Sequence, residues 1–299
     1  GKQIPNIKII NISVIDKNTI GFSKCETIIG NLGCGLYTLN LKTKKTNEKK
    51  KLDSDMLILS LDFASPNKFA YLVTADEKWQ MFLFDNGDLK ILENIATKEH
   101  GRGGFIEDSE KIRFSEDEKY ILQVSTSSPR SSSDFNVYVY DLANGSKQVI
   151  SGATQPEWLN NETIIYRKYE KSGDGLYIYN VNTKNQEKIN GIDNASYDPM
   201  VLTRTNKIVY TIYPNKQIWL YDFNTKKNSK ILDASLYGFW VTPTKIIYEE
   251  IEECNGKENC GGMMGYEVKS VALFDLKNNI KIGLIPDLES IYNATSEYK

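Results

Sequence analysis

The chain has 299 residues, of which 40% are hydrophobic and 25% are charged, and it holds 18 Tyr and 11 Phe. That mixture is typical of a folded protein rich in strand-forming aromatic residues and excludes a disordered chain. Lysine and arginine total 37 against 39 aspartates and glutamates, a net charge of −2, so the positive surplus that a nucleic-acid partner requires is missing. No stretch approaches the roughly 18 apolar residues of a membrane span, and we expect no transmembrane segment.

A short alternating strand that ends in Asp or Asn and runs into a turn recurs six times. The copies are Tyr37–Asn40, Phe82–Asp85, Tyr138–Asp141, Tyr177–Asn180, Trp219–Asp222 and Ala272–Asp275. Their spacing is close to the roughly 40 to 50 residues of a four-stranded propeller blade. Each closing Asp or Asn precedes a polar turn, so we expect it to hydrogen-bond the local backbone rather than to join a ring of ligand-binding groups.

A second unit, a tight polar turn followed by a β-rich strand, comes before each of these copies. It is found at Lys17–Phe22, Ser65–Val73, Ser115–Leu122, Asn160–Tyr166, Thr205–Tyr210 and Thr242–Tyr248. Together the two units predict four strands in every repeat, because Val, Ile, Tyr and Phe alternate as in half-buried strands. The predicted fold class is all-β, a six-bladed β-propeller of four-stranded antiparallel blades.

The repeats are expected to form one domain over residues 1–299. The blades are expected at about 7–52, 53–93, 105–150, 153–190, 195–232 and 236–285, with 286–299 as a tail or a closing strand.

Two of the repeats carry a resemblance to known proteins. The segments Phe63-Ala-Ser-Pro-Asn-Lys-Phe-Ala and Phe114-Ser-Glu-Asp-Glu-Lys-Tyr-Ile resemble the repeat signature of TolB-like and related WD-like propellers, over residues 7–285. The resemblance implies a six-bladed propeller, a fold shared by periplasmic scaffolds, peptidase regulatory domains and some lyases. It names no activity, because one fold supports many functions.

The long connections between the predicted strands share one face of the propeller. They are Lys24–Gly35, Glu93–Gly104, Ser125–Asn136 and Glu250–Lys269, whereas the turns of the opposite face are short. The alternative explanation is that the insertions are tolerated without having a function, but such insertions would lengthen the loops of both faces. We therefore expect the long-loop face to bind a partner.

All four cysteines lie in these connections, Cys25 and Cys34 in the first repeat and Cys254 and Cys260 in the last. Two local disulfides are the favoured interpretation and would place the protein in an oxidising, extracytoplasmic compartment: periplasmic, secreted or at the cell surface. A zinc site formed by all four thiolates is the more specific alternative, although the spacing within each pair is wider than structural zinc sites prefer. Free thiols are the third alternative.

Motifs for catalysis and cofactor binding are missing, so we predict no cofactor, no metal and no catalytic residue. His100 is the only histidine, and no partner spacing supports a triad around it. The candidate ligand-binding residues on the long-loop face are His100, Arg102, Arg130, Trp158, Tyr197, Tyr237 and Trp240. The aromatic members stand near the predicted starts of inner strands, where packing is the competing interpretation.

The segment Lys42–Lys51 holds six lysines in ten residues, and its two interpretations are a solvated hairpin and a patch for an anionic surface.

For the whole chain, the leading hypothesis is a non-enzymatic extracytoplasmic propeller that binds a protein or peptide. The alternative is a carbohydrate-binding or carbohydrate-active propeller, of lyase or hydrolase type, with a glycan site at the mouth of the central tunnel. A third interpretation is one domain of a longer surface protein.

Overall fold

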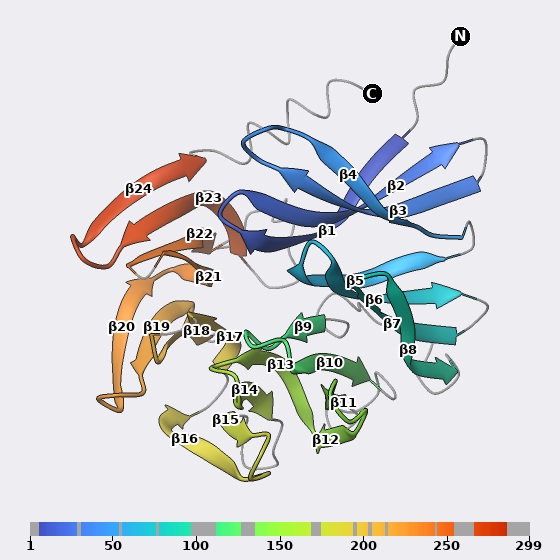
Figure 1. Ribbon diagram of the computed structural model, residues 1–299. Coiled ribbons are helices and arrows are strands. Elements are labelled where there is room, and N and C mark those ends of the chain that lie inside the picture. The colour runs from blue at the N-terminus through green and yellow to red at the C-terminus, as the bar shows by residue number, and fades with distance from the viewer. Residues whose placement is uncertain are drawn as a thin grey trace. The chain divides into compact units, whose positions relative to one another are not determined.

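The computed structural model is built from short antiparallel sheets (Figure 1). It describes residues 6–28, 31–53, 56–75, 78–96, 112–126, 135–168, 175–193, 196–202, 205–212, 215–242, 244–253 and 266–285. Over these ranges it holds strands and turns, and no helix there is long and apolar enough to cross a membrane. The chain divides into two compact units, residues 1–154 and 155–299, which are described separately.

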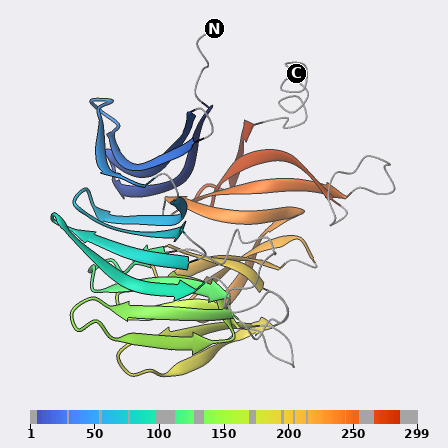
Figure 2. The same ribbon diagram turned by 90° about the vertical axis from the view of Figure 1, so that its right-hand side faces the viewer.

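The first unit contains three sheets, each of four strands in chain order. The first comprises β1 (Asn6–Asp16), β2 (Thr19–Ile28), β3 (Asn31–Asn40) and β4 (Thr46–Lys51). The second comprises β5 (Leu57–Ser65), β6 (Lys68–Ala75), β7 (Lys78–Asp85) and β8 (Asp88–Ala96). The third comprises β9 (Ile112–Phe114), β10 (Tyr120–Thr126), β11 (Phe135–Asp141) and β12 (Lys147–Ser151). Figure 2 shows these sheets stacked in chain order, from blue through cyan to green.

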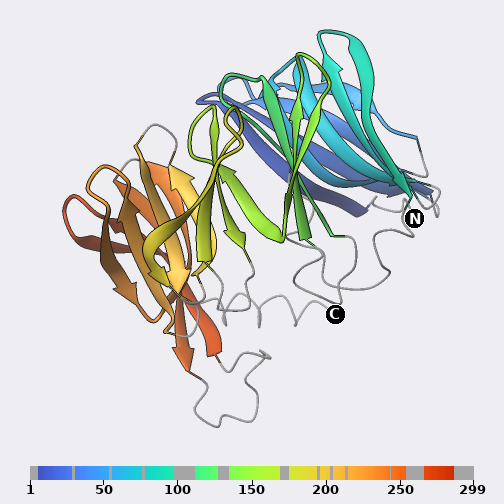
Figure 3. The same cartoon turned by 90° about the horizontal axis from the view of Figure 1, so that it is seen from below.

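The second unit repeats the pattern. Its sheets are β13 (Ala153–Trp158), β14 (Thr163–Lys168), β15 (Gly175–Asn180) and β16 (Gln186–Asp193), then β17 (Ser196–Leu202), β18 (Lys207–Ile212), β19 (Gln217–Asp222) and β20 (Lys227–Asp233). The last is β21 (Ser235–Thr242), β22 (Lys245–Glu253), β23 (Tyr266–Asp275) and β24 (Ile280–Ile285) (Figure 3). The predicted six four-stranded antiparallel sheets are thus confirmed.

The core of each unit lies between neighbouring sheets, which explains the continuous apolar runs of the second strands. In β6, Phe69 and Tyr71 belong to the cluster shared with the first sheet, whereas Ala70 and Leu72 belong to the cluster shared with the third. The same division occurs in β18, where Ile208 and Val209 pack into different clusters. A strand buried on both faces needs apolar side chains at every position, so these strands read as unbroken hydrophobic runs.

The repeated Asp and Asn residues close the turns, as predicted. Asn180 Oδ1 accepts hydrogen bonds from the backbone N–H groups of Asn182 and Thr183, at 3.1 and 2.9 Å. Equivalent pairs of bonds are accepted by Asn40, Asp222 and Asp275, and a single one by Asp141. These side chains are used by their own turns, and the structural interpretation of the repeat is confirmed for them.

One predicted loop is instead a hairpin of two regular strands. The segment Lys24–Gly35 was expected to be an insertion, but β2 and β3 remain paired up to Ile28 opposite Asn31. Gly30, Gly33 and Gly35 suggest a loop in the sequence, yet cross-strand pairing overrides that local preference. The strands also continue into the other predicted insertions, with β8 reaching Ala96 and β22 reaching Glu253.

Candidate functional site

The connections differ in length between the two ends of the strands. By the strand bounds, those that join the first strand of a sheet to its second, or the third to its fourth, are short, for example the turns after Asp16 and Asp85. The long ones, which span residues 97–111, 127–134, 169–174 and 254–265, join second to third strands or one sheet to the next. The strand bounds therefore keep the asymmetry that the sequence predicts, with two long connections in each unit.

By the strand bounds, three of the seven predicted ligand-binding residues fall within these long connections, and the other four belong to strands. His100, Arg102 and Arg130, like Cys254 and Cys260, lie outside the described residues. Tyr197 in β17 and Tyr237 and Trp240 in β21 are described only in their backbone. Whether these residues bind a ligand stays a prediction.

Trp158 is placed differently from the expectation. It is the last residue of β13 and adjoins the short turn to β14, rather than standing near the start of its strand. The reason is that β13 begins at Ala153, directly after Gly152, which has a positive φ of 69°. With 6% of its surface exposed, Trp158 is buried.

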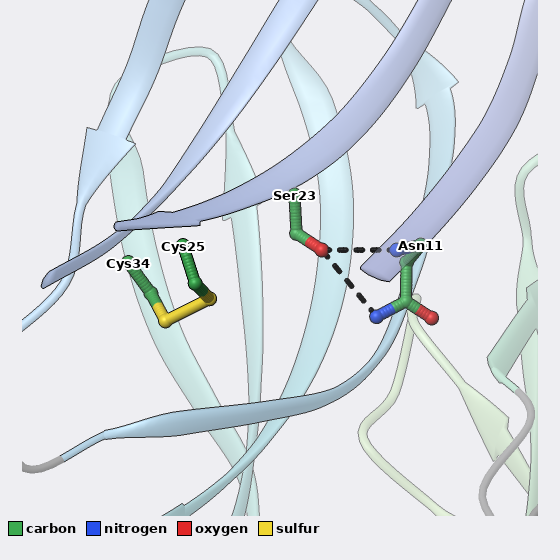
Figure 4. The surroundings of a disulfide bond; sticks show 4 residues. All are labelled: Asn11, Ser23, Cys25 and Cys34. Atoms are coloured by element: carbon green, nitrogen blue, oxygen red, sulfur yellow. Dashed lines mark hydrogen bonds between the residues drawn. A yellow bond between two sulfur atoms is a disulfide. The ribbon is translucent and has the colours of Figure 1, made fainter. Parts of the chain in front are cut away.

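The first pair of cysteines forms the predicted disulfide (Figure 4). Cys25 and Cys34 stand directly opposite each other in the β2–β3 register, with their Cα atoms 4.1 Å apart. Their exposed fractions are 2% and 3%, and both pack into the cluster of Leu36 and Phe69. The bridge uses two of the four thiolates that the zinc alternative requires. Among the described residues, no group of three or more His, Cys, Asp or Glu could hold a metal ion.

Sequence reasoning missed a polar ladder across the first strands of the first unit. Ser13, Asp62 and Arg113 occupy the same register position in β1, β5 and β9, opposite Gly21, Ala70 and Leu122. The Ser13 hydroxyl donates to Asp62 Oδ1 at 2.7 Å and accepts from the Phe63 N–H at 3.2 Å. Asp62 Oδ2 accepts from the Phe114 N–H at 2.9 Å.

These bonds satisfy backbone donors on strand edges that have no neighbouring strand in their own sheet. Ser60 does the same for Ile112, whose N–H it accepts at 3.1 Å. The first strands β1 and β5 are therefore each tied to the next sheet through side chains. The only sequence signal is the recurrence of a polar residue just before the first turn of successive repeats.

Burial raises the pKa of Asp62, while the Arg113 guanidinium and the hydrogen bonds from Phe114 and Ser13 oppose the rise. Both carboxylate oxygens are already engaged, so Asp62 is not available as a general base in this arrangement. The ladder thus joins neighbouring sheets of the first unit through hydrogen bonds.

A second polar group joins the second and third sheets. The Tyr140 hydroxyl lies 3.0 Å from Glu93 Oε2 and 2.9 Å from an amide atom of the buried Gln123. Lys147 Nζ contacts the same Glu93 oxygen at 2.5 Å and lies 5.0 Å from the centre of the Tyr138 ring. Burial, followed by the Glu93 charge, raises the pKa of Tyr140 far above its usual value. The phenol therefore stays protonated and acts as a donor.

The last sheet carries a comparable carboxylate. Glu250 accepts from the Ser270 hydroxyl and from Lys281 Nζ, both at 2.5 Å. Burial works against the charged form, but the bonds from Lys281 and Ser270 outweigh it and hold the pKa of Glu250 below its usual range. This group too is fully engaged by its neighbours.

No protein-family model matches the sequence, and no curated protein matches it. Solved structures do match. The β-propeller domain of the trilobed protease from Pyrococcus furiosus, described as having an open velcro topology, is 11% identical with a TM-score of 0.63, over 93% of this chain and 83% of that one. Oligogalacturonate lyase from Vibrio parahaemolyticus is 9% identical with a TM-score of 0.59, over 94% and 85%.

TolB from Acinetobacter baumannii gives a weaker likeness, with 15% identity and a TM-score of 0.48 over 90% of this chain and 69% of that one. At these identities a structural likeness shows the fold alone. The matches above 0.5, together with the six four-stranded sheets, confirm the predicted six-bladed β-propeller fold.

Proposed function

We propose that this chain is a non-enzymatic extracytoplasmic propeller that binds a protein or peptide through the end of its strands that carries the long connections. The observation that supports this most directly is the difference in length between the two ends. By the bounds of the described strands, the connections at the opposite end are short, and several described turns there are closed by an Asp or Asn side chain, as at Asn180 and Asp222. The long connections lie at strand ends, where a rigid set of strands can present them to a partner.

The polar clusters among the described residues favour a binding role over a catalytic one. The carboxylates of Asp62, Glu93 and Glu250 are each engaged by neighbouring donors. These bonds tie the three carboxylates to the strands of the fold, which supports a structural role for them. The Cys25–Cys34 bridge supports the extracytoplasmic part of the proposal, since such bonds persist in oxidising compartments.

The test removes one long connection and leaves the strands in place. In the trimmed variant, Ser127–Asp134 are replaced by Asn-Gly, a two-residue turn suited to an antiparallel pair such as β10 and β11. A matched control carries a Gly-Ser-Gly insertion after Asn144, at the other end of the same sheet. Both variants are checked for unchanged far-UV circular dichroism before use.

Partner capture is then compared by quantitative mass spectrometry of proteins retained from the extracytoplasmic fraction of the source cells. We expect a set of proteins that the unaltered chain and the insertion control retain and that the trimmed variant loses. Identical capture by all three proteins would contradict the proposal. Saturable binding on a glycan array, abolished by the same trimming, would favour the carbohydrate-binding alternative instead.

A further inference from the structure

The outer strand of the first sheet is unusually basic. Residues 42–51, which include β4 and most of the turn before it, contain Lys42, Lys44, Lys45, Lys49, Lys50 and Lys51. The lysines of the turn and Lys51 are exposed, while Lys49 and Lys50 are half-buried. In a chain whose net charge is −2, six positive charges are thus gathered on one edge of one sheet.

No carboxylate of the described ranges is paired with these lysines. None of the six forms an ion pair with a residue of the described ranges, and Lys49 Nζ donates at 3.3 Å to a neutral acceptor, Asn67 Oδ1. The one carboxylate within the segment, Glu48, instead accepts a hydrogen bond from the Tyr37 hydroxyl at 3.1 Å.

Other outer strands hold fewer lysines without an ion pair. Lys147 of β12 is paired with Glu93 at 2.5 Å, Lys230 of β20 with Asp233 at 2.8 Å, and Lys281 of β24 with Glu250 at 2.5 Å. Single lysines without an ion pair in the described ranges occur at Lys90 of β8 and Lys227 of β20. What distinguishes β4 is therefore the number of such lysines in one strand and its turn, where adjacent ammonium groups repel one another until an anion approaches.

The lysines follow a line rather than a flat patch. They begin in the turn and continue to the end of β4, and a strand of this length extends roughly 20 Å. β4 is also the last strand in the order β1-β2-β3-β4, so within the described part of the chain one of its edges has no strand partner. Such an edge offers backbone N–H and C=O groups to an extended chain.

We propose that the free edge of β4 binds an acidic peptide segment in extended conformation, which adds to the first sheet as a further strand. The backbone of β4 supplies the hydrogen bonds, and Lys42–Lys51 supply the counter-charges for its Asp and Glu side chains. This site differs from the long connections at the strand ends and does not depend on the proposed function.

The probe is a fluorescein-labelled ten-residue peptide of alternating Glu and Val, titrated with the full chain and followed by fluorescence anisotropy. A second peptide of the same sequence carries an N-methyl group at every amide, which keeps its charge and removes the donors along both edges. We expect saturable binding of the first peptide, weakened by added salt because exposed charges are screened, and at least tenfold weaker binding of the second.

Two matched variants locate the site. Lys44→Gln/Lys45→Gln removes two exposed lysines from the turn before β4, and Lys226→Gln/Lys227→Gln removes two exposed lysines at the start of β20. Exposed ion pairs contribute modestly, so the first variant is expected to weaken binding roughly threefold to tenfold. The second is expected to leave binding unchanged.

Three results would overturn the proposal: no saturable binding of the first peptide, equal binding of the N-methylated peptide, or equal weakening by the two variants. Tighter binding of a heparin oligosaccharide than of the first peptide would also overturn it, because the lysines would then bind polyanions in general rather than an extended peptide. None of these results bears on the trimmed variant of the long connection.

Discussion

Among single residues, Gly21 shows how closely the first two sheets pack. A Cβ atom built at Gly21 would lie 2.1 Å from the Phe63 ring, and the Phe63 ring packs in a tilted arrangement against Phe69, with 4.9 Å between the ring centroids. Neither ring is free to retreat, because both are buried in the same cluster. The absence of a side chain in β2 is what allows β5 to approach.

We expect Gly21→Ala to lower the free energy of unfolding by about 1–3 kcal/mol, the usual effect of overpacking a core. Gly283→Ala is the matched control, since nothing lies within 4 Å of a Cβ at that strand position. Urea unfolding of both variants measures the difference. Equal stability of the two would show that Phe63 moves aside without loss.

Because the pKa of Asp62 is raised in the folded state, its contribution to the free energy of unfolding decreases as the pH rises. Burial raises its pKa in the folded state, so the folded protein keeps a proton that the unfolded chain, with an ordinary pKa of about 3.9, has already released. The contribution of Asp62 to stability is therefore largest below that value and declines as the pH rises through the folded-state pKa.

Asp62→Asn removes this titration. The free energy of unfolding of the variant, minus that of the unaltered chain, should rise with pH from about 4 upward and then become constant. Urea unfolding at a series of pH values measures it, with the exposed Asp88→Asn as the control for loss of a carboxylate. A difference that falls with rising pH would contradict the assignment.

Of the individual elements, the β2–β3 hairpin depends most on a covalent bond. Cys25 and Cys34 close a short loop between strands that pair directly, with a sequence separation of 9. A bridge across a loop of this size stabilises by about 2–3 kcal/mol in the chain-entropy model.

We therefore expect Cys25→Ala/Cys34→Ala to lower the free energy of unfolding by about that amount under non-reducing conditions. Repeating the comparison with reductant present isolates the bridge, because the unfolded reference chain is then open in both proteins. If the difference between the two proteins is unchanged by reductant, the loss comes from packing alone.

The turns were the most predictable elements, and the hairpin was the least. Asn40, Asn180 and Asp222 mark turns because a short polar side chain reaches the next backbone N–H groups, a local interaction that the sequence encodes directly. The extent of β2 and β3 depends instead on pairing and on the bridge between Cys25 and Cys34, which no local pattern encodes.

The polar ladder of Ser13, Asp62 and Arg113 was also not predictable from local sequence patterns. Asp62 lies between Leu61 and Phe63 in a strand, where alternation alone predicts a solvent-facing side chain. Its partners Ser13 and Phe114 are distant in sequence, so only the packing of neighbouring sheets reveals that the carboxylate is engaged. The position of the long connections, in contrast, follows from the repeat itself.

For the molecule as a whole, the oxidation state of the cysteines tests the proposed extracytoplasmic location. We expect the native chain to be four protons lighter than its reduced form, two of them from the Cys25–Cys34 bridge and two from the predicted Cys254–Cys260 bridge. Intact-mass spectrometry with and without reductant measures this. Four thiols that alkylate without prior reduction would contradict an extracytoplasmic location.

Each sheet of the described chain is formed by one unbroken stretch of sequence, and none combines strands from the two ends of the chain. A polypeptide leaving the ribosome therefore completes the hydrogen bonding of a sheet once its fourth strand has emerged, without waiting for residues still to be translated. The apolar core between two sheets, in contrast, needs the strands of both, as in the cluster of Leu36 and Phe69.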